Sequence, residues 1–339
     1  MIGKLHSPSP SILDESIVAP CHKCMPDTVA VIDVGSNSIK LLVARAEAKP
    51  NSLETIFSKT IETRISEGIS CKLPSLNEEA IAAGTATIAE LHGMAQNYQP
   101  DHTVIVATSA VRDAINGEGF VQAVETVTGI QIRTLSGTEE ANYIGQGLSC
   151  DPAIAGMTSF IQTDIGGGSL ELIRFEAGQI QQAISLQLGA VRLTERFIEN
   201  IDAALSFKIE ASIHTYVTEQ LMNSGFDFSP AELPLIATGG AYSLSRALLV
   251  AEVGGEIDNS SPHLERSSLN QLKKKLAPLP LKERLSIPQL PPARADIMPT
   301  ALIIIDALLE VSKRSSITHS FYNLRYGVAA NLLKNKTKW

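Results

Sequence analysis

The chain has 339 residues, 44% of them hydrophobic and 19% charged, a composition typical of a soluble globular protein with room for two cores. Its 28 basic and 36 acidic residues give a net charge of −8, which argues against nucleic-acid binding through broad positive charge. It contains no run of about 18 apolar residues and no secretory pattern at the N-terminus, so we expect a cytoplasmic protein that neither spans nor binds a membrane.

Residues 1–27 carry Ser and Pro without periodicity and predict a mobile extension. Within it, Cys21 and Cys24 have the spacing of half a zinc site. A structural zinc site needs four ligands and no second pair follows, so an incidental thiol pair is the preferred interpretation. With Cys71 and Cys150 the chain has four scattered cysteines, too few for a disulfide scaffold.

Regular structure begins with two apolar runs, 29–34 and 39–46, joined by the turn Asp33-Val34-Gly35-Ser36-Asn37-Ser38. We predict strand, polar turn and strand, followed by a third strand over 53–65. The capping-box pattern Ser75-Leu76-Asn77-Glu78 then predicts a helix that runs to about Tyr98.

A short buried strand, Val104 to Ala107, delivers Thr108, Ser109 and Arg112 to its carboxyl end. In open α/β sheets that end faces the ligand crevice. Ser109 would begin a helix whose amides favour an anion, and Arg112 would offer its planar fork to phosphate oxygens. The alternative is an ordinary helix cap followed by an exposed arginine.

Glu139 and Glu140 stand in the first turn of a predicted helix over 137–147. Carboxylates are favoured there by the helix dipole, which alone could explain them. Successive helical side chains point about 100° apart, so only one of the two can face a cleft. Chain order leaves open which one.

The stretch Thr163 to Glu171 holds a second strand, turn and strand, with Gly166-Gly167-Gly168 at its centre and Ser169 after it. Three glycines leave backbone N–H groups open to a phosphate. Asp164 and Glu171 flank the turn, and a divalent cation such as Mg²⁺ would reconcile these carboxylates with a phosphate. A plain glycine-rich hairpin is the alternative.

A polyanionic ligand would need a local basic lining, for which Lys40, Arg112, Arg192 and Arg246 are the candidates. Each could instead be a solvated surface charge.

A third glycine turn, Gly239-Gly240, follows a strand over 235–238. Approach to a nucleotide and simple close packing both remain open there. Further expected elements are strands over 158–164, 169–175, 180–186 and 316–322, and helices over 119–128, 188–200, 203–222 and 242–251.

The two Asp-x-Gly turns resemble the paired phosphate hairpins of actin-like ATPases and sugar kinases. The residues of these two turns, together with four further motifs in the same order along the chain, resemble the exopolyphosphatase / guanosine pentaphosphate phosphatase family. The resemblance extends over about residues 28–333 and is to the short two-domain form. The further motifs are Ala107-Thr108-Ser109-Ala110-Val111-Arg112, Ser136-Gly137-Thr138-Glu139-Glu140-Ala141, Leu188-Gly189-Ala190-Val191-Arg192 and Ala237-Thr238-Gly239-Gly240.

The resemblance implies an α/β fold of two actin-like (ribonuclease H-like) domains, each a mixed sheet flanked by helices, with a cleft between them. We expect domain I over 28–150 and domain II over 151–339, with the terminal helix returning to domain I. Family members often carry an acidic residue where this chain has Tyr326, which weakens any site role for that segment.

The resemblance also implies the chemistry. It assigns Glu140 as general base for water, Arg112 as the stabiliser of phosphate charge, and Asp164, Glu171 and Asp33 as ligands of Mg²⁺ or another divalent cation. Phosphate would be held by Gly35, Ser36, Asn37, Ser38, Ser109, Gly166, Gly167, Gly168 and Ser169. The implied substrate is inorganic polyphosphate, or alternatively guanosine pentaphosphate. An actin-like kinase, a non-catalytic alarmone sensor and a homodimer are further possibilities.

Overall fold

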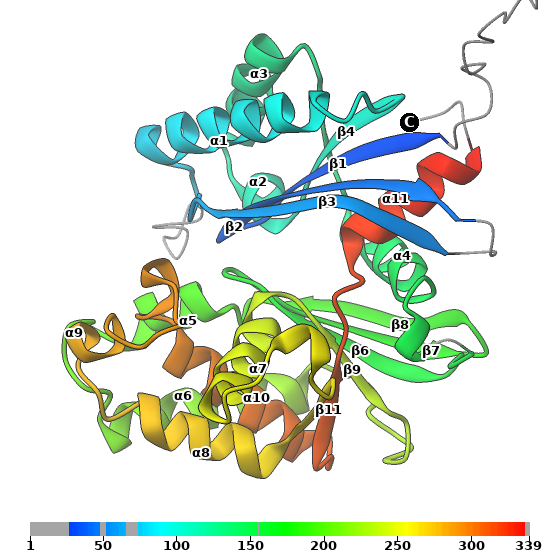
Figure 1. Ribbon diagram of the computed structural model, residues 1–339. Helices are drawn as coiled ribbons and strands as arrows, with labels where there is room; N and C mark the ends of the chain where they lie inside the picture. The colour runs from blue at the N-terminus through cyan, green and yellow to red at the C-terminus, as the bar shows by residue number, and fades with distance from the viewer. Residues whose placement is uncertain (1–26, 48–51, 66–73, 155, 336–339) are drawn as a thin grey trace, which may run out of the picture.

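The computed structural model describes residues 27–47, 52–65, 74–154 and 156–335. These residues form two mixed β-sheets in succession, each flanked by helices (Figure 1). The predicted α/β fold class is confirmed. The Cys21 and Cys24 pair, and most of the predicted extension, lie outside the described residues.

The first sheet has the strand order β3-β2-β1-β4-β5. β1 and β2 are antiparallel, as are β2 and β3, whereas β4 runs parallel to both β1 and β5. Its strands are β1 (Thr28–Val34), β2 (Ser38–Ala46), β3 (Leu53–Glu62), β4 (His102–Ala107) and β5 (Ile132–Thr134). β3 therefore ends three residues before the predicted end at residue 65.

Both faces of β1 are buried, because its alternate residues enter different cores. Ala30 and Ile32 pack under α1 (Glu78–Gln96) and α3 (Gly117–Thr128), beside the short helix α2 (Ser109–Asp113). Val29 and Val31 pack under α4 (Gly137–Leu148) and α11 (Leu324–Asn335). A run that is apolar at every position thus reflects a strand covered on both sides.

The second sheet has the order β10-β11-β9-β6-β7-β8. Its strands are β6 (Phe160–Ile165), β7 (Leu170–Glu176), β8 (Gln179–Leu186), β9 (Leu235–Thr238), β10 (His263–Glu265) and β11 (Ser316–His319). Its helices are α5 (Ala190–Phe197), α6 (Phe207–Asn223), α7 (Gly240–Glu252), α8 (Arg266–Leu276), α9 (Leu281–Arg284) and α10 (Met298–Val311). None of the described helices is long and apolar enough to cross a membrane.

The two sheets share one connectivity. On one side of β1, the strands β2 and β3 follow as antiparallel neighbours of one another, and on the other side β4 and β5 run parallel to β1. In the same way, β7 and β8 follow β6 as antiparallel neighbours on one side, and β9 and β11 run parallel to β6 on the other. The repeated sequence pattern therefore reflects a repeated topology.

Helices α4 and α11 lie between the two sheets (Figure 1). They pack closely because glycines face the neighbouring helix: a Cβ on Gly327 would lie 1.7 Å from the carbonyl oxygen of Tyr143. α11 thus contacts β1 and β2 although it comes from the end of the chain. A domain boundary near residue 150, with residues 151–339 as the second domain, stays a proposal.

Two local expectations need correction. The first helix is capped by Asn77, whose Oδ1 accepts from the N–H of Ala80 at 2.6 Å, and not by Ser75. An Asx side chain one residue before the helix competes better for its free N–H groups than the earlier serine. The last strand, expected over 316–322, is β11 and ends at His319.

Candidate active site

The two Asp-x-Gly hairpins have the same strand register, so their residues can be compared position by position. In the first hairpin Asp33 pairs across the strands with Lys40. In the second hairpin, at the same register position, Asp164 pairs with Glu171. Each hairpin therefore carries an aspartate at the end of its first strand, opposite a charged residue whose sign differs between the two.

Both turns leave backbone donors open. The turns close with equivalent hydrogen bonds, from the N–H of Gly35 to the oxygen of Ser38 at 3.2 Å and from the N–H of Gly166 to the oxygen of Ser169 at 2.9 Å. In the described part of the chain, the N–H of the residue after each of these glycines makes no hydrogen bond. Adjacent open amides of this kind attract anions.

The glycine triplet is held from behind by the start of α5. The N–H groups of Gly189, Ala190 and Arg192 donate to the carbonyls of Gly168, Gly166 and Gly167, at 3.2, 3.0 and 3.0 Å. The Arg192 side chain adds a bond from Nε to the Gly168 oxygen at 2.8 Å. Arg192, a candidate for the basic lining, therefore fixes the turn and does not line the cavity described next.

A cavity of about 90 Å³, here called the central cavity, lies between the two hairpins. All predicted site residues except Arg112 and Gly168 line it. They are Asp33, Gly35, Ser36, Asn37, Ser38, Ser109, Glu140, Asp164, Gly166, Gly167, Ser169 and Glu171. Residues separated by more than one hundred positions thus meet at one place.

Three serine hydroxyls join the elements around this cavity. Ser109 Oγ lies 3.3 Å from Ser36 Oγ of the first hairpin and 3.3 Å from Ser169 Oγ of the second. Gly168 packs behind them, since a Cβ there would lie 3.6 Å from Ser36 Oγ. A hydroxyl can donate or accept, so this cluster can turn its protons toward an anion.

The structure separates the two glutamates of α4. Glu139 forms the capping box with Ser136 and an ion pair with Arg133, and its pKa is lowered to about 2, chiefly by the Ser136 N–H. Glu140 lines the central cavity instead and is almost fully buried. Arg112 Nη1 donates to Glu140 Oε2 at 3.0 Å and to the Leu135 oxygen at 2.9 Å. Arg112 therefore supports Glu140 from outside the cavity wall.

Four carboxyl groups in one small cavity repel each other. Burial raises the pKa of Glu140 to about 7, against the opposing effect of Arg112 and with a further contribution from Asp33 and Asp164. Burial, with the charges of Glu140 and Asp164, raises the pKa of Glu171 to about 8. The pKa values of Asp33 and Asp164 are also raised by burial, and Lys40 counteracts this for both.

These carboxylates fit a divalent cation that the substrate helps to hold. Among the described residues, no three His, Cys, Asp or Glu side chains are close enough to hold a metal alone. Mg²⁺ is usually bound through one or two carboxylates together with water and substrate phosphates. The Asp164 and Glu171 pair offers two such ligands, and a cation would relieve the repulsion that raises their pKa values.

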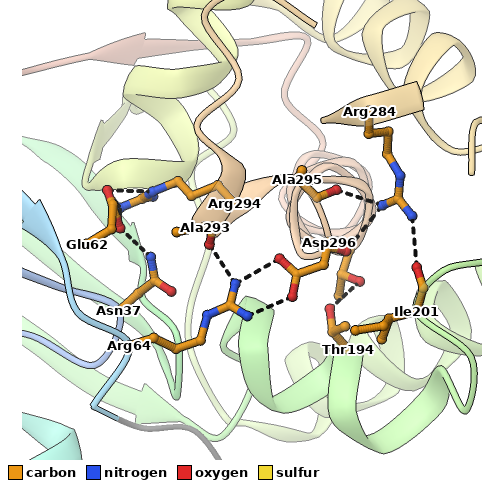
Figure 2. A network of polar contacts seen from close by, with 11 residues as sticks. Asn37, Glu62, Arg64, Thr194, Ile201, Arg284, Ala293, Arg294, Ala295 and Asp296 are labelled. Atoms are coloured by element: carbon orange, nitrogen blue, oxygen red, sulfur yellow. Dashed lines mark hydrogen bonds and ion pairs between the residues drawn. The ribbon is translucent and has the colours of Figure 1, made fainter. Parts of the chain in front are cut away.

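Besides Lys40, the cation Arg294, just before α10, lines the central cavity. It was not among the site residues predicted from the sequence. Figure 2 shows its guanidinium paired with Glu62, by Nε to Oε1 at 2.9 Å and Nη2 to Oε2 at 3.1 Å. Glu62 Oε2 also accepts from Asn37 Nδ2 at 2.6 Å, which ties the first hairpin to the second half of the chain. Of the four proposed lining cations, Lys40 alone is among the described residues that line the cavity.

A second ion pair lies beside this one in Figure 2. Arg64, just after β3, donates from Nη1 and Nη2 to both oxygens of Asp296, at 2.8 and 2.7 Å. Its Nη2 also donates to the Ala293 oxygen. Side-chain exposures of 24% and 11% make this a largely buried bridge between the two halves. Only folding brings these distant residues together, so their spacing gave no signal.

The Gly239-Gly240 turn is closely packed at the cavity wall. Gly239 has a φ of +92°, and a Cβ there would lie 2.0 Å from Asp164 Oδ1. Asp164 Oδ2 accepts from Thr238 Oγ1 at 2.8 Å, so the strand before the turn orients the same carboxylate. A Cβ on Gly240 would meet the Arg294 guanidinium at 2.0 Å. Close packing thus explains these glycines without a nucleotide.

Comparison with known proteins identifies the family. The sequence pattern of the Ppx/GppA phosphatase family matches residues 42–336. Exopolyphosphatase 2 of Mycobacterium tuberculosis is 27% identical over 318 residues, which is 90% of this chain and 98% of that protein. The chain belongs to the Ppx/GppA phosphatase family.

Solved structures show the same fold. An exopolyphosphatase from Cytophaga hutchinsonii superposes with a TM-score of 0.79 at 23% identity, covering 91% of this chain and 98% of that one. The Ppx/GppA enzyme of Aquifex aeolicus superposes with a TM-score of 0.72 at 21% identity, covering 90% and 99% of the two chains.

Proposed function

We propose that this chain, as a member of the Ppx/GppA phosphatase family, is an exopolyphosphatase that releases the terminal phosphate of inorganic polyphosphate by hydrolysis. One observation carries the proposal: Glu140, with a pKa near 7, lines the same cavity as two turns with open backbone amides. The M. tuberculosis relative, an exopolyphosphatase by name, supports polyphosphate as the substrate.

In the proposed reaction, the Glu140 carboxylate takes a proton from a water molecule while the water oxygen bonds to the terminal phosphorus. The bond from that phosphorus to the bridging oxygen breaks, and the shortened chain leaves with the electron pair. A base acts best when its pKa lies near the working pH, so a value of about 7 suits Glu140. Arg112 acts as a positioning residue, since it bonds to Glu140 and does not line the cavity.

The open amides of the two turns and the hydroxyls of Ser36, Ser109 and Ser169 would hold the terminal phosphate oxygens. Positioning and charge neutralisation supply most of the catalysis in phosphoryl transfer. Asp164 and Glu171, with Asp33 on the opposite hairpin, would hold Mg²⁺, which when bound neutralises phosphate charge.

A phosphate-release assay tests the proposal. The purified chain is given tripolyphosphate, long polyphosphate, guanosine pentaphosphate and ATP, each with Mg²⁺ and again with a chelator. We expect release from polyphosphate that stops with the chelator and returns with Mg²⁺. Release from guanosine pentaphosphate alone would replace polyphosphate by that nucleotide as the substrate, and no release from any of them would refute the proposal.

A further inference from the structure

Each of the two carboxylates on the second hairpin accepts a hydrogen bond from a hydroxyl of the neighbouring strand. Asp164 Oδ2 accepts from Thr238 Oγ1 of β9 at 2.8 Å, and Glu171 Oε1 accepts from Ser185 Oγ of β8 at 2.9 Å. Both pairs are direct partners in the strand register. Neither Thr238 nor Ser185 is among the described residues that line the central cavity. A strand hydroxyl behind the cavity wall thus occupies one of the two oxygens of each carboxylate.

The hydroxyl proton of Thr238 has its direction fixed by Gln162. Both side chains are fully buried, and Gln162 Nε2 donates to Thr238 Oγ1 at 3.0 Å. An amide nitrogen can only donate, and a hydroxyl has a single proton. Thr238 therefore accepts from Gln162 and donates to Asp164. The opposite amide orientation would bring three acceptors around that one proton.

The matched positions of the first hairpin lack these donors. Asp33 lies opposite Val106 in the parallel neighbour β4, where the aspartate of the second hairpin has Thr238. Two residues before each aspartate, the first strand has Val31 and the second has Gln162. Within the described part of the chain, no donor bonds to the Asp33 carboxylate. The same topology thus forms without the donor chain, so the fold alone does not require it.

The Gln162 amide is also incompletely satisfied. Its buried Oε1 has no hydrogen-bond partner among the described residues. A buried polar atom without a partner destabilises a fold, and a valine in its place, as at position 31, would avoid that cost. Its bond to Thr238 gives the amide a reason to be there, because that bond sets how Asp164 is presented to the central cavity.

The number of free oxygens matters for the choice of cation. Ca²⁺ accepts carboxylates through one oxygen or through both and tolerates irregular geometry. Mg²⁺ is smaller and demands near-octahedral geometry, with one or two carboxylates completed by water and phosphate oxygens. A carboxylate with one oxygen bonded to a hydroxyl can give a cation only the other oxygen. Such a site suits Mg²⁺ and denies Ca²⁺ the two-oxygen contact.

We propose that Thr238, fixed by Gln162, and Ser185 are positioning residues that restrict Asp164 and Glu171 to one oxygen each and so favour Mg²⁺ over Ca²⁺. This rests on the proposed function, which assigns both carboxylates to the metal. Partners of this kind, one step behind the ligands, typically change metal affinity by about 10- to 100-fold when they are replaced.

Thr238→Val removes the hydroxyl and keeps the shape of the side chain, whereas Thr238→Ser keeps the hydroxyl. Thr194→Val is the matched control, because Thr194 is also buried and its Oγ1 donates to Thr300 Oγ1 at 2.7 Å, away from the cavity lining. Ser185→Ala changes an exposed position with little risk to folding, so it decides the question if Thr238→Val does not fold.

Mn²⁺ is the probe for a measurement without turnover. Its binding to the whole chain is followed by electron paramagnetic resonance with inorganic phosphate present, and displacement by Mg²⁺ or by Ca²⁺ gives the Kd of each. In Thr238→Val we expect the Kd of Mg²⁺ to rise about tenfold or more and that of Ca²⁺ to change less. Ser185→Ala should move the ratio in the same direction by a smaller factor, because water can replace an exposed hydroxyl. Thr238→Ser and Thr194→Val should keep the wild-type ratio.

The outcomes separate this proposal from the proposed function. An unchanged ratio of the two Kd values in Thr238→Val and Ser185→Ala, with Mg²⁺-dependent phosphate release by the wild type, would overturn the proposal and leave the hydrolase intact. An equal loss of affinity for both cations would also overturn it, since the hydroxyl would then not select between them. The expected shift without phosphate release from any substrate would refute the hydrolase and keep the cation assignment. No binding of Mn²⁺ to the wild type would overturn the metal site itself.

Discussion

Replacing Glu140 by Gln tests the general base directly. Gln keeps the size of the side chain and can still accept from Arg112, but it cannot take a proton from water. We expect kcat to fall by about 10² to 10⁴, equivalent to about 3 to 5 kcal/mol of barrier, with little change in KM. Phosphate release measured from pH 5.5 to 8.5 checks this. Wild-type activity should rise through about pH 7, where Glu140 loses its proton, and the variant should lack that rise.

The same substitution has a signature in stability. The pKa of Glu140 rises from an ordinary 4.5 to about 7 in the folded protein, so the folded state binds this proton more tightly than the unfolded chain. Its contribution to stability is therefore full below pH 4.5 and is lost as the pH rises through about 7. The difference amounts to roughly 3 kcal/mol. Relative to Glu140→Gln, the wild-type midpoint of thermal unfolding should fall between pH 5 and pH 8.

Glu139→Gln provides the matched control one residue away. Glu139 is about 40% exposed, pairs with Arg133 and caps α4, and does not line the central cavity. We expect wild-type kcat and a loss of about 1 kcal/mol or less in the unfolding free energy. Equal loss of kcat in the two variants, or wild-type kcat in Glu140→Gln, would refute the assignment of the base.

Three further predictions follow from the same contacts. Arg112→Lys, which replaces a planar fork by a point charge, should shift the alkaline rise of the rate profile to higher pH because it weakens the contact that lowers the pKa of Glu140. Gly239→Ala should lose most activity, since its Cβ would displace Asp164, which we propose as a metal ligand. Gly225→Ala, also at positive φ but in open space, should cost about 1 kcal/mol of unfolding free energy and no activity. Asp296→Asn should lower the unfolding free energy by about 2 kcal/mol in chemical denaturation, because it leaves a largely buried arginine without its charge partner.

Local sequence pattern was enough to predict the parts of the site that lie within one hairpin. An Asp-x-Gly turn between two apolar runs specifies its own hairpin, so Asp33 and Asp164 could be placed from the sequence alone. Arg294 could not be found in this way, since it reaches the first sheet from a segment more than 200 residues later. Lys40 was a candidate for the basic lining from its charge alone, and comparison of the two hairpins strengthens this, because it stands where the second hairpin has Glu171.

The difference between Lys40 and Glu171 at matched positions suits a cavity that would bind a phosphate and a metal ion together. If position 40 also carried an acid, the central cavity would hold a further carboxylate. The pKa values of Asp33 and Asp164, already raised by burial, would then rise more. With Lys40 in the first hairpin, two of the three carboxylates proposed to bind a metal, Asp164 and Glu171, lie on the second hairpin, and a positive charge lies on the first. The repeated fold therefore supplies two equivalent turns with open amides, and the unequal charges beside them give the cavity an acidic side at the second hairpin and a positive charge at the first.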